Sequence, residues 1–410
     1  MGDSPGWEGT LLWLGATVIA ALSARALLGR VDLPSILGYL LLGVVLRMAD
    51  RQWGLLSSNS YEAFHFLAAL GLFALLFKVG LKSNLRGLLA QLRRAAGVWT
   101  GDVLLSGALG FVTAYFLLGF EPIPSAVVAV ALTATSVGVS VAVWQNAGAL
   151  DTPDGQLLTD VAELDDMTGI ALMALLFSLL PAIHGGSDRA LWPLVGTTVG
   201  LVLLKLAAVI ALCAVFSCYL ERPITRTLFH SLDLPGPMVC VAAIGMLIAA
   251  LAAVLGLSLA IGAFLAGLAF SRDPKEHQLE SSFEALYEFF SPFFFIGIGL
   301  NVDPDVAARG LGYGLPLLLA AVLGKYIGVF LTAWFTTPAA GAALLGLSMV
   351  PRAEIALVIM QRGRDLGDWA VPAEAFAAMV VVSAGTCALA PLALHPLLRR
   401  WKGRKADEDK

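Results

Sequence analysis

Charged residues are scarce in this sequence of 410 residues. Asp, Glu, Lys and Arg together make up 14% of it, hydrophobic residues make up 58%, and the mean hydropathy is +0.83. In an average soluble domain roughly a quarter of the residues are charged. This composition therefore excludes an ordinary soluble protein and predicts a polytopic membrane protein. The net charge of −4 gives no basic excess for binding nucleic acid.

Cysteine and histidine are also few, with four and five residues. All four cysteines lie in apolar runs, without the paired spacing of a zinc site or the loop placement of a disulfide framework. The histidines fall near span ends or in loops, and the polar loops contain no pair of nucleophile and base. We therefore expect no resident metal or other cofactor, and a protein that is not an enzyme. The cysteines are Cys213, Cys218, Cys240 and Cys387.

Long apolar runs fill most of the chain. Runs of roughly 15 to 25 residues are long enough to cross a bilayer as helices, and we count about thirteen of them. The sequence thus predicts an all-α polytopic membrane protein. The predicted spans are 9–28, 33–49, 62–80, 96–119, 124–147, 155–183, 190–219, 236–255, 257–270, 287–302, 313–335, 338–361 and 373–398.

Lys and Arg residues in the short loops predict the orientation. With the N-terminus outside, most of these residues fall on the inner side, together with the basic tail 399–410. We therefore expect a multi-pass protein of a cell (inner) membrane, with its C-terminus and this short tail in the cytoplasm.

Two pairs of segments reveal an internal repeat. Segment 36–43 matches 260–267, each with two Gly residues five positions apart, and segment 77–84 resembles 295–302. Because matching segments lie seven spans apart in this list, on the second and ninth spans and on the third and tenth, they must cross the membrane in opposite senses. Inverted-topology repeats are typical of transporters, whose substrate site lies near the middle of the membrane beside broken helices.

The run 124–147 is interrupted by hydroxyl side chains. Thr133, Thr135 and Ser136 precede Gly138 in the middle of this apolar run. Hydroxyls within helices often bond back to their own backbone. The glycine favours a break instead, so we expect at least one of these hydroxyls to have a function.

A second interruption lies in the run 338–361. Pro351 removes a helical hydrogen bond, and it is followed closely by Arg352 and Glu354. Free backbone groups at membrane depth are tolerated only beside protein or water. The two charges could neutralise the ends of half-helices or contact an ion, and both interpretations stay open.

Carboxylates inside the run 155–183 are the first candidates for a functional site. Asp165 and Asp166 are flanked by apolar sequence on both sides, where each carboxylate costs at least a few kcal/mol unless it meets a partner or water. Neighbouring helical residues point about 100° apart, so we expect different partners for the two. Glu163 and Asp160, nearer the inner end, could form an entrance funnel; Glu163 could equally be a supporting partner and Asp160 simply interfacial.

Two lysines also lie deep in apolar runs. Lys325 is too deep to extend to the surface and needs an anion, for which Asp165 or Asp166 is the obvious partner. A lysine that faces a cavity without a role in transport is the alternative. Lys205 has no acidic neighbour in its run, so we interpret it as structural or facing a subunit interface.

Taken together, these motifs resemble the cation:proton antiporter superfamily, in particular its second family and the bacterial sodium/proton antiporters with an Asp-Asp motif. The likeness covers nearly the whole chain. The segments that carry it are 133–138, 164–166, 324–325 and 349–354, with the Gly-Leu pairs at 80–81 and 299–300. Two positions depart from the common pattern: Lys82 stands where Glu is usual, and Ala353 where Gly is common.

The resemblance implies the sodium/proton antiporter fold, with inverted repeats and two crossed discontinuous helices. It also implies a homodimer in which a core domain (62–183 and 287–398) moves like an elevator against a dimerisation or scaffold domain (9–49 and 190–270). The partners would be a monovalent cation, protons and the lipid bilayer.

The resemblance also assigns roles to residues. Asp166 would be the principal ion and proton carboxylate, Asp165 the partner of Lys325, and Thr135 the residue at the first helix break. Sodium would then bind to Asp166, Asp165 and Thr135. If Lys325 releases a proton when Asp165 turns to the cation, exchange would be electrogenic.

The function predicted from the sequence is secondary-active sodium (or lithium)/proton antiport. A potassium/proton antiporter or potassium-efflux protein on the same fold is the first alternative, although the potassium-efflux relatives commonly carry Gln-Asp in place of Asp-Asp. A gated ion channel is less favoured because no filter-like motif of carbonyls is present. The Asp-Asp and Lys residues argue against a bile-acid-type sodium symporter.

Overall fold

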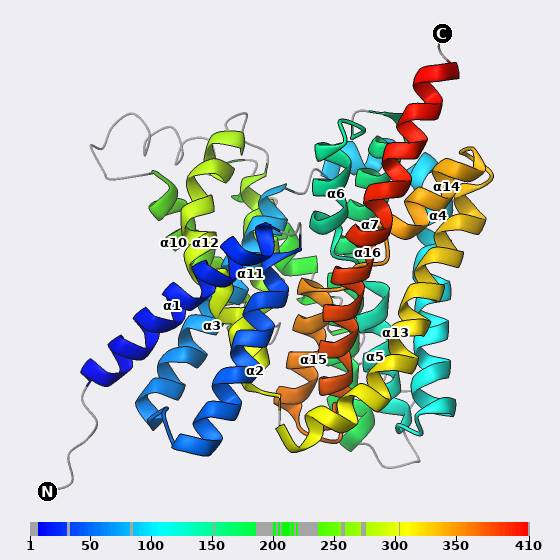
Figure 1. The fold of residues 1–410 in the computed structure, drawn as a ribbon. Helices are drawn as coiled ribbons and strands as arrows, with labels where there is room; N and C mark the ends of the chain where they lie inside the picture. Colours follow the sequence, from blue (N-terminus) through cyan, green and yellow to red (C-terminus); the bar gives the residue numbers. More distant parts are fainter. Residues whose placement is uncertain are drawn as a thin grey trace, which may run out of the picture. The chain divides into compact units, whose positions relative to one another are not determined.

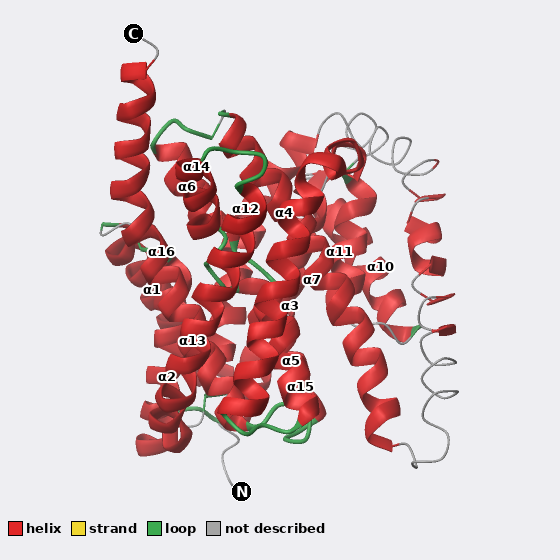
Figure 2. Cartoon of the chain, turned by 90° about the vertical axis from the view of Figure 1, so that its right-hand side faces the viewer, coloured by secondary structure: helices red, strands yellow, loops and turns green. Residues whose placement is uncertain are grey.

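All regular elements in the described residues of the computed structural model are helices (Figures 1 and 2). This confirms the predicted all-α fold. The residues described are 7–30, 33–82, 85–150, 152–185, 200–201, 204–205, 207–213, 215–216, 219, 237–255, 259–271, 276–302 and 304–408.

The helices follow the apolar runs closely. The predicted span 190–219 lies largely outside the described residues. The helices are α1 (Trp7–Gly29), α2 (Ser35–Trp53), α3 (Ser58–Lys82), α4 (Leu85–Val112), the π-helix η1 (Thr113–Leu117), α5 (Pro122–Thr133), α6 (Val137–Asn146), α7 (Pro153–Gly185), α10 (Pro237–Val254), α11 (Leu259–Phe270), α12 (Glu276–Leu300), α13 (Pro304–Ala333), α14 (Ala339–Ser348), α15 (Glu354–Leu366) and α16 (Ala373–Glu408).

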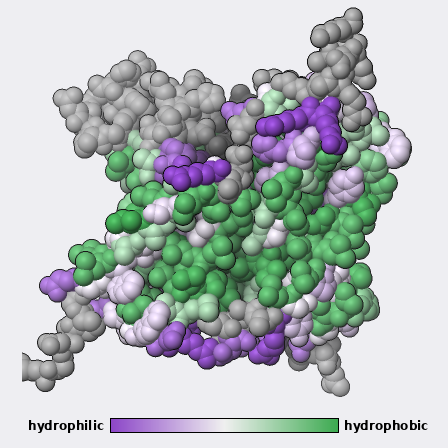
Figure 3. All heavy atoms as spheres, in the orientation of Figure 1, coloured by the Kyte–Doolittle hydropathy of each residue, from purple (hydrophilic) through white to green (hydrophobic). Residues whose placement is uncertain are grey.

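Seven stretches within the described residues are long and apolar enough to cross a membrane, and three shorter apolar helices accompany them. On the face shown in Figure 3, apolar side chains cover the middle parts of the helices, and hydrophilic residues gather near helix ends. Leu12 and Phe66, for example, are 75% and 65% exposed. Lipid, not water, suits such surfaces. The chain is therefore a multi-pass membrane protein, and the count of about thirteen spans stays a prediction.

The chain forms two compact units. One comprises Met1–Ser60, Gly87–Met173 and Phe295–Lys410, and the other comprises Tyr61–Arg86 and Ala174–Phe294. The predicted core and dimerisation domains are defined by relative motion, which compactness does not report, so that division stays a prediction. All of the residues that form the site described below belong to the first unit.

Glycines join the two copies of the internal repeat in the same way. A Cβ atom added to Gly43 of α2 would lie 2.8 Å from the Cα of Gly299 of α12, so the two backbones touch. In the other unit, a Cβ on Gly80 of α3 would lie 3.0 Å from the Cα of Gly267 of α11. In each crossing, the first segment of one copy packs against the second segment of the other copy, as matched repeats require.

Candidate functional site

Two helices are interrupted, and their interruptions lie against each other. The backbone is not helical between α5 and α6, nor between α14 and α15. Across the gap the Ser136 amide donates to the carbonyl of Pro351 at 2.8 Å, and the Thr135 hydroxyl donates to the carbonyl of Met349 at 3.4 Å. This confirms the predicted pair of crossed discontinuous helices.

Further hydrogen bonds hold the two halves of this crossing together. The Ser140 hydroxyl of α6 donates to the carbonyl of Ser348 at 2.6 Å, and the Trp144 indole N–H donates to the Ser348 hydroxyl at 2.8 Å. These bonds satisfy polar groups at the last turn of α14, where helical partners are missing.

Arg352 and Glu354 lie at opposite helix ends. The buried Arg352 guanidinium donates through Nη1 to the carbonyl of Met349 at 3.1 Å and to the hydroxyl of Thr135 at 3.3 Å. Glu354 is in the first turn of α15. A cation at the carbonyl end of α14 and an anion at the amide end of α15 each oppose the partial charge of a half-helix. Direct contact of either residue with an ion stays a prediction.

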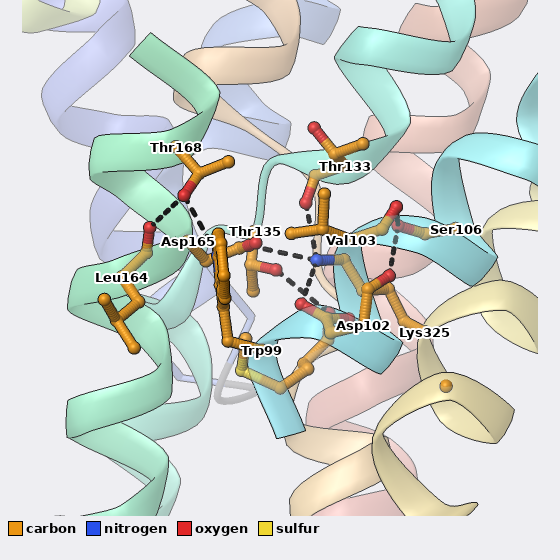
Figure 4. A network of polar contacts seen from close by, with 12 residues as sticks. Trp99, Asp102, Val103, Ser106, Thr133, Thr135, Leu164, Asp165, Thr168 and Lys325 are labelled. Carbon is orange, nitrogen blue, oxygen red and sulfur yellow. Dashed lines mark hydrogen bonds and ion pairs between the residues drawn. The ribbon is translucent and has the colours of Figure 1, made fainter. Parts of the chain in front are cut away.

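Lys325 lies at the centre of the site. Its Nζ donates to Asp165 Oδ2 at 3.0 Å, to Asp102 Oδ2 at 2.5 Å and to the carbonyl oxygen of Thr133 at 2.5 Å (Figure 4). The lysine side chain is 0% exposed. The structure therefore brings together α7, α4, the end of α5 and α13 around one buried ammonium group.

Asp102 is the site residue that the sequence reasoning missed. Its side chain is 0% exposed, and it lies within the predicted span 96–119. The rule that singled out Asp165, a carboxylate inside an apolar run, applies equally to Asp102. The signal was present in the sequence.

Close packing of α4 on α13 places Asp102 beside the lysine. A Cβ atom added to Gly328 would lie 2.5 Å from the carbonyl oxygen of Gly101, and one added to Gly324 would lie 2.8 Å from the Cα of Ser106. Only glycine allows backbones to approach this closely. The two helices thus meet backbone to backbone on either side of the ion pair.

Asp166 has different surroundings from Asp165. Asp165 is 1% exposed, whereas Asp166 is half-buried. Burial and the negative charges of Asp165, Glu354 and Glu163 all act against a charge on Asp166, and the positive charge of Lys325 acts in the opposite direction. Such an excess of negative charge favours binding of a cation or a proton.

The hydroxyl residues of the first break do not act alike. The Thr133 hydroxyl donates back to its own helix at Val130, and it is the Thr133 carbonyl that contacts Lys325. The Thr135 hydroxyl faces the second break, as described above. The Ser136 hydroxyl is buried and has no hydrogen-bond partner among the described residues.

Comparison with known proteins gives the family. The family described as "Sodium/hydrogen exchanger, transmembrane" matches residues 17–400. The chain belongs to this family. It is thus a transporter, a cation:proton antiporter, and not an enzyme.

Individual relatives of this exchanger match over most of their length. It is 30% identical over 383 residues to the "Na(+)/H(+)-K(+) antiporter GerN" of Bacillus cereus, covering 92% of each chain. It is 28% identical over 362 residues to the "High-affinity Na(+)/H(+) antiporter NhaS3" of Synechocystis, covering 86% of this chain and 75% of the relative. The solved sodium proton antiporter MjNhaP1 of Methanocaldococcus jannaschii has a TM-score of 0.73, covering 95% of this chain and 97% of that one. With 16% identity, this last likeness shows the fold.

Several predicted site residues of the exchanger stay predictions in their roles. The structure places Asp160 and Glu163 half-buried on α7, before the Asp pair. The set of Asp165, Asp166 and Thr135 as sodium ligands also stays a prediction, since the Thr135 hydroxyl contacts protein groups.

Lys78 lies one helical turn before the departure at Lys82 on α3. The ammonium group of Lys78 lies 2.5 Å from a carboxylate oxygen of Glu284 and 3.8 Å from the ring centre of Tyr287, all within the second compact unit. The side chain of Lys82 lies outside the described part of the chain.

Proposed function

We propose that this exchanger is a secondary-active sodium (or lithium)/proton antiporter, in which the cation and protons compete for Asp165 and Asp166. The observation that carries the proposal is the buried contact of Asp165 with Lys325 beside two helix breaks. Buried carboxylates at membrane depth are expensive unless paired, and they mark ion and proton pathways. The names of the relatives GerN and NhaS3 as Na(+)/H(+) antiporters support sodium as the cation.

The geometry supports competition at the carboxylates. Asp165 uses Oδ2 for the lysine, and its Oδ1 accepts no hydrogen bond from the described residues. A buried carboxylate oxygen without a partner loses its hydration without compensation. A partly dehydrated cation or a proton would restore that interaction, and Asp166 supplies a second carboxylate on the next residue.

Several finer features belong to this proposal. We expect elevator-type exchange, with the core domain (62–183 and 287–398) moving against the scaffold domain (9–49 and 190–270). We place the protein in a cell (inner) membrane with its N-terminus outside and its C-terminus in the cytoplasm. Alternating access follows from inverted repeats and discontinuous helices at the site.

Potassium is the second candidate cation. The relative with 30% identity is named a "Na(+)/H(+)-K(+) antiporter", a name that includes potassium. The carboxylate chemistry of the site accommodates either ion, and selectivity depends on the size and rigidity of the cavity.

Proton flux in proteoliposomes tests the cation. With an imposed pH difference, addition of sodium or lithium should dissipate the gradient, and empty liposomes are the control. A response to potassium alone would exclude the sodium proposal. Currents recorded on supported membranes in the same preparation test electrogenic exchange, because release of a proton by Lys325 would move net charge in each cycle.

A further inference from the structure

We propose that Asp102 is the fixed counter-ion of Lys325, which balances the lysine's charge while Asp165 exchanges the lysine for the transported cation. Asp102 is thus a positioning residue that acts through Lys325. The inference rests on the proposed competition at Asp165 and Asp166 and deepens it.

The contacts of Lys325 are unequal. Its Nζ lies 2.5 Å from Asp102 Oδ2 and 3.0 Å from Asp165 Oδ2, and both carboxylates are buried. An ammonium group in an apolar interior is stable only when its charge is compensated and its donors are bonded. Asp102 makes the shorter of the two ion pairs.

The packing of α4 on α13 holds Asp102 beside the lysine. Asp102 follows Gly101, whose backbone touches Gly328 of α13, one turn after Lys325. No side chain separates the two helices there, so Asp102 stays with the lysine when α13 moves. Asp165 is on α7, next to Asp166.

The charge balance explains why a second carboxylate matters. When Asp102, Asp165 and Lys325 are all ionised, the three groups carry one excess negative charge. Arg352, whose positive charge also acts on both carboxylates, is bonded to groups at the helix crossing. Asp165 can therefore leave the lysine for a cation without leaving an uncompensated ammonium behind.

Removal of Asp102 has two consequences for cation binding. Asp165 becomes the only carboxylate that contacts Lys325, so the cation must compete with a complete ion pair. The site also loses one negative charge. Both effects weaken cation binding, while the groups that carry the ion remain in place.

The first test compares Asp102→Asn with two controls in proteoliposomes, using sodium and proton flux. We expect Asp102→Asn to raise the KM for sodium by about tenfold or more, since charge interactions are strong in a medium of low dielectric constant. The kcat should change little, because the loss is in ground-state binding. Asp102→Glu keeps the charge and should restore much of the affinity.

The matched control is Asp154→Asn. Asp154 is another buried carboxylate of the same compact unit, 6% exposed, and it accepts a hydrogen bond from Thr337 at 3.0 Å. It does not contact the lysine in the structure. We expect this variant to retain the wild-type KM.

The double variant Asp102→Asn/Lys325→Gln separates charge pairing from a merely structural role. It removes an oppositely charged pair together, so the net charge of the site equals that of the wild type. We expect its KM to return towards the wild-type value. A folded Asp102→Asn protein with an unchanged KM would overturn the proposal, as would a double variant with a KM no better than that of the single variant.

The test still gives a decision if a variant fails to fold. If Asp102→Asn does not fold, folding of the double variant decides: a folded protein after removal of both charges supports the pairing, and a double variant that also fails to fold overturns it. The wild-type arm tests the proposed function separately. If potassium and not sodium drives exchange in the wild type, the KM of each variant is compared with that of the wild type for potassium.

Discussion

Asp165 and Asp166 are neighbours in the sequence with separate environments. Adjacent side chains on a helix point about 100° apart, so only one of them can reach Lys325. Asp165 makes that contact, and Asp166 is left half-buried among the negative charges of Glu163 and Glu354. The pair therefore combines one carboxylate held by a lysine with one that is surrounded by the charges of other carboxylates.

Replacement of Asp166 by Asn should abolish exchange. A neutral amide can neither release a proton nor balance a cation, although it keeps the size of the side chain. We expect sodium-dependent proton release in proteoliposomes to fall to the level of empty liposomes, with thermal unfolding in detergent close to that of the wild type. Sodium-dependent proton release by a well-folded Asp166→Asn protein would contradict this assignment.

Residue-level predictions from the sequence succeed where a charge is costly. Asp165 and Lys325 stand out because each is ionisable within an apolar run, and the structure brings them together. The contact of the lysine with the Thr133 carbonyl could not be predicted, since every residue carries a carbonyl and the sequence does not show which one is exposed at a helix break.

The crossing of α4 and α13 sets the position of the ion pair at the level of helices. A side chain at Gly328 would meet the backbone of Gly101, and a backbone cannot move aside as a flexible side chain can. In the same helix, Gly312 has nothing within 4 Å of an added Cβ. Gly328 and Gly312 therefore lie on the same helix but have different surroundings.

Substitution of these glycines by Ala should have opposite effects. Gly328→Ala should reduce the free energy of unfolding by about 1–3 kcal/mol, because the methyl group forces α4 from α13. Gly312→Ala should be neutral or stabilise by up to about 1 kcal/mol through helix propensity. Thermal unfolding in detergent measures both. Equal melting temperatures for the two variants would refute the tight crossing.

Helix positions were largely predictable, and helix ends less so. Apolar runs mark only the part of a helix that lies in lipid, so a helix can extend beyond its run. The helix α12 begins at Glu276, before the predicted residue 287, and α16 continues to Glu408, beyond the predicted residue 398. Charged residues such as Lys, Arg and Glu extend a helix readily in water, where hydropathy does not detect it. The predicted tail 399–410 is thus helical as far as it is described.

Assembly is the prediction for the whole molecule. The resemblance to the antiporter superfamily implies a homodimer, in which the scaffold domain (9–49 and 190–270) gives the moving core a fixed support. Native mass spectrometry or light scattering, corrected for detergent, should give the mass of two chains. A monomer that exchanges ions at the full rate in liposomes reconstituted at one chain per vesicle would contradict this expectation.

The order of synthesis gives the buried ion pair a second consequence. Lys325 follows Asp165 by 160 residues and Asp102 by 223. During translation, α4 and α7 therefore reach the membrane before their cation exists, and each carboxylate adds a few kcal/mol to the cost of insertion. We expect the nascent N-terminal half to stay with the insertion machinery until α13 emerges. Chains that end before α13 should therefore be degraded, and pulse-chase labelling of truncated chains would measure their rate of loss.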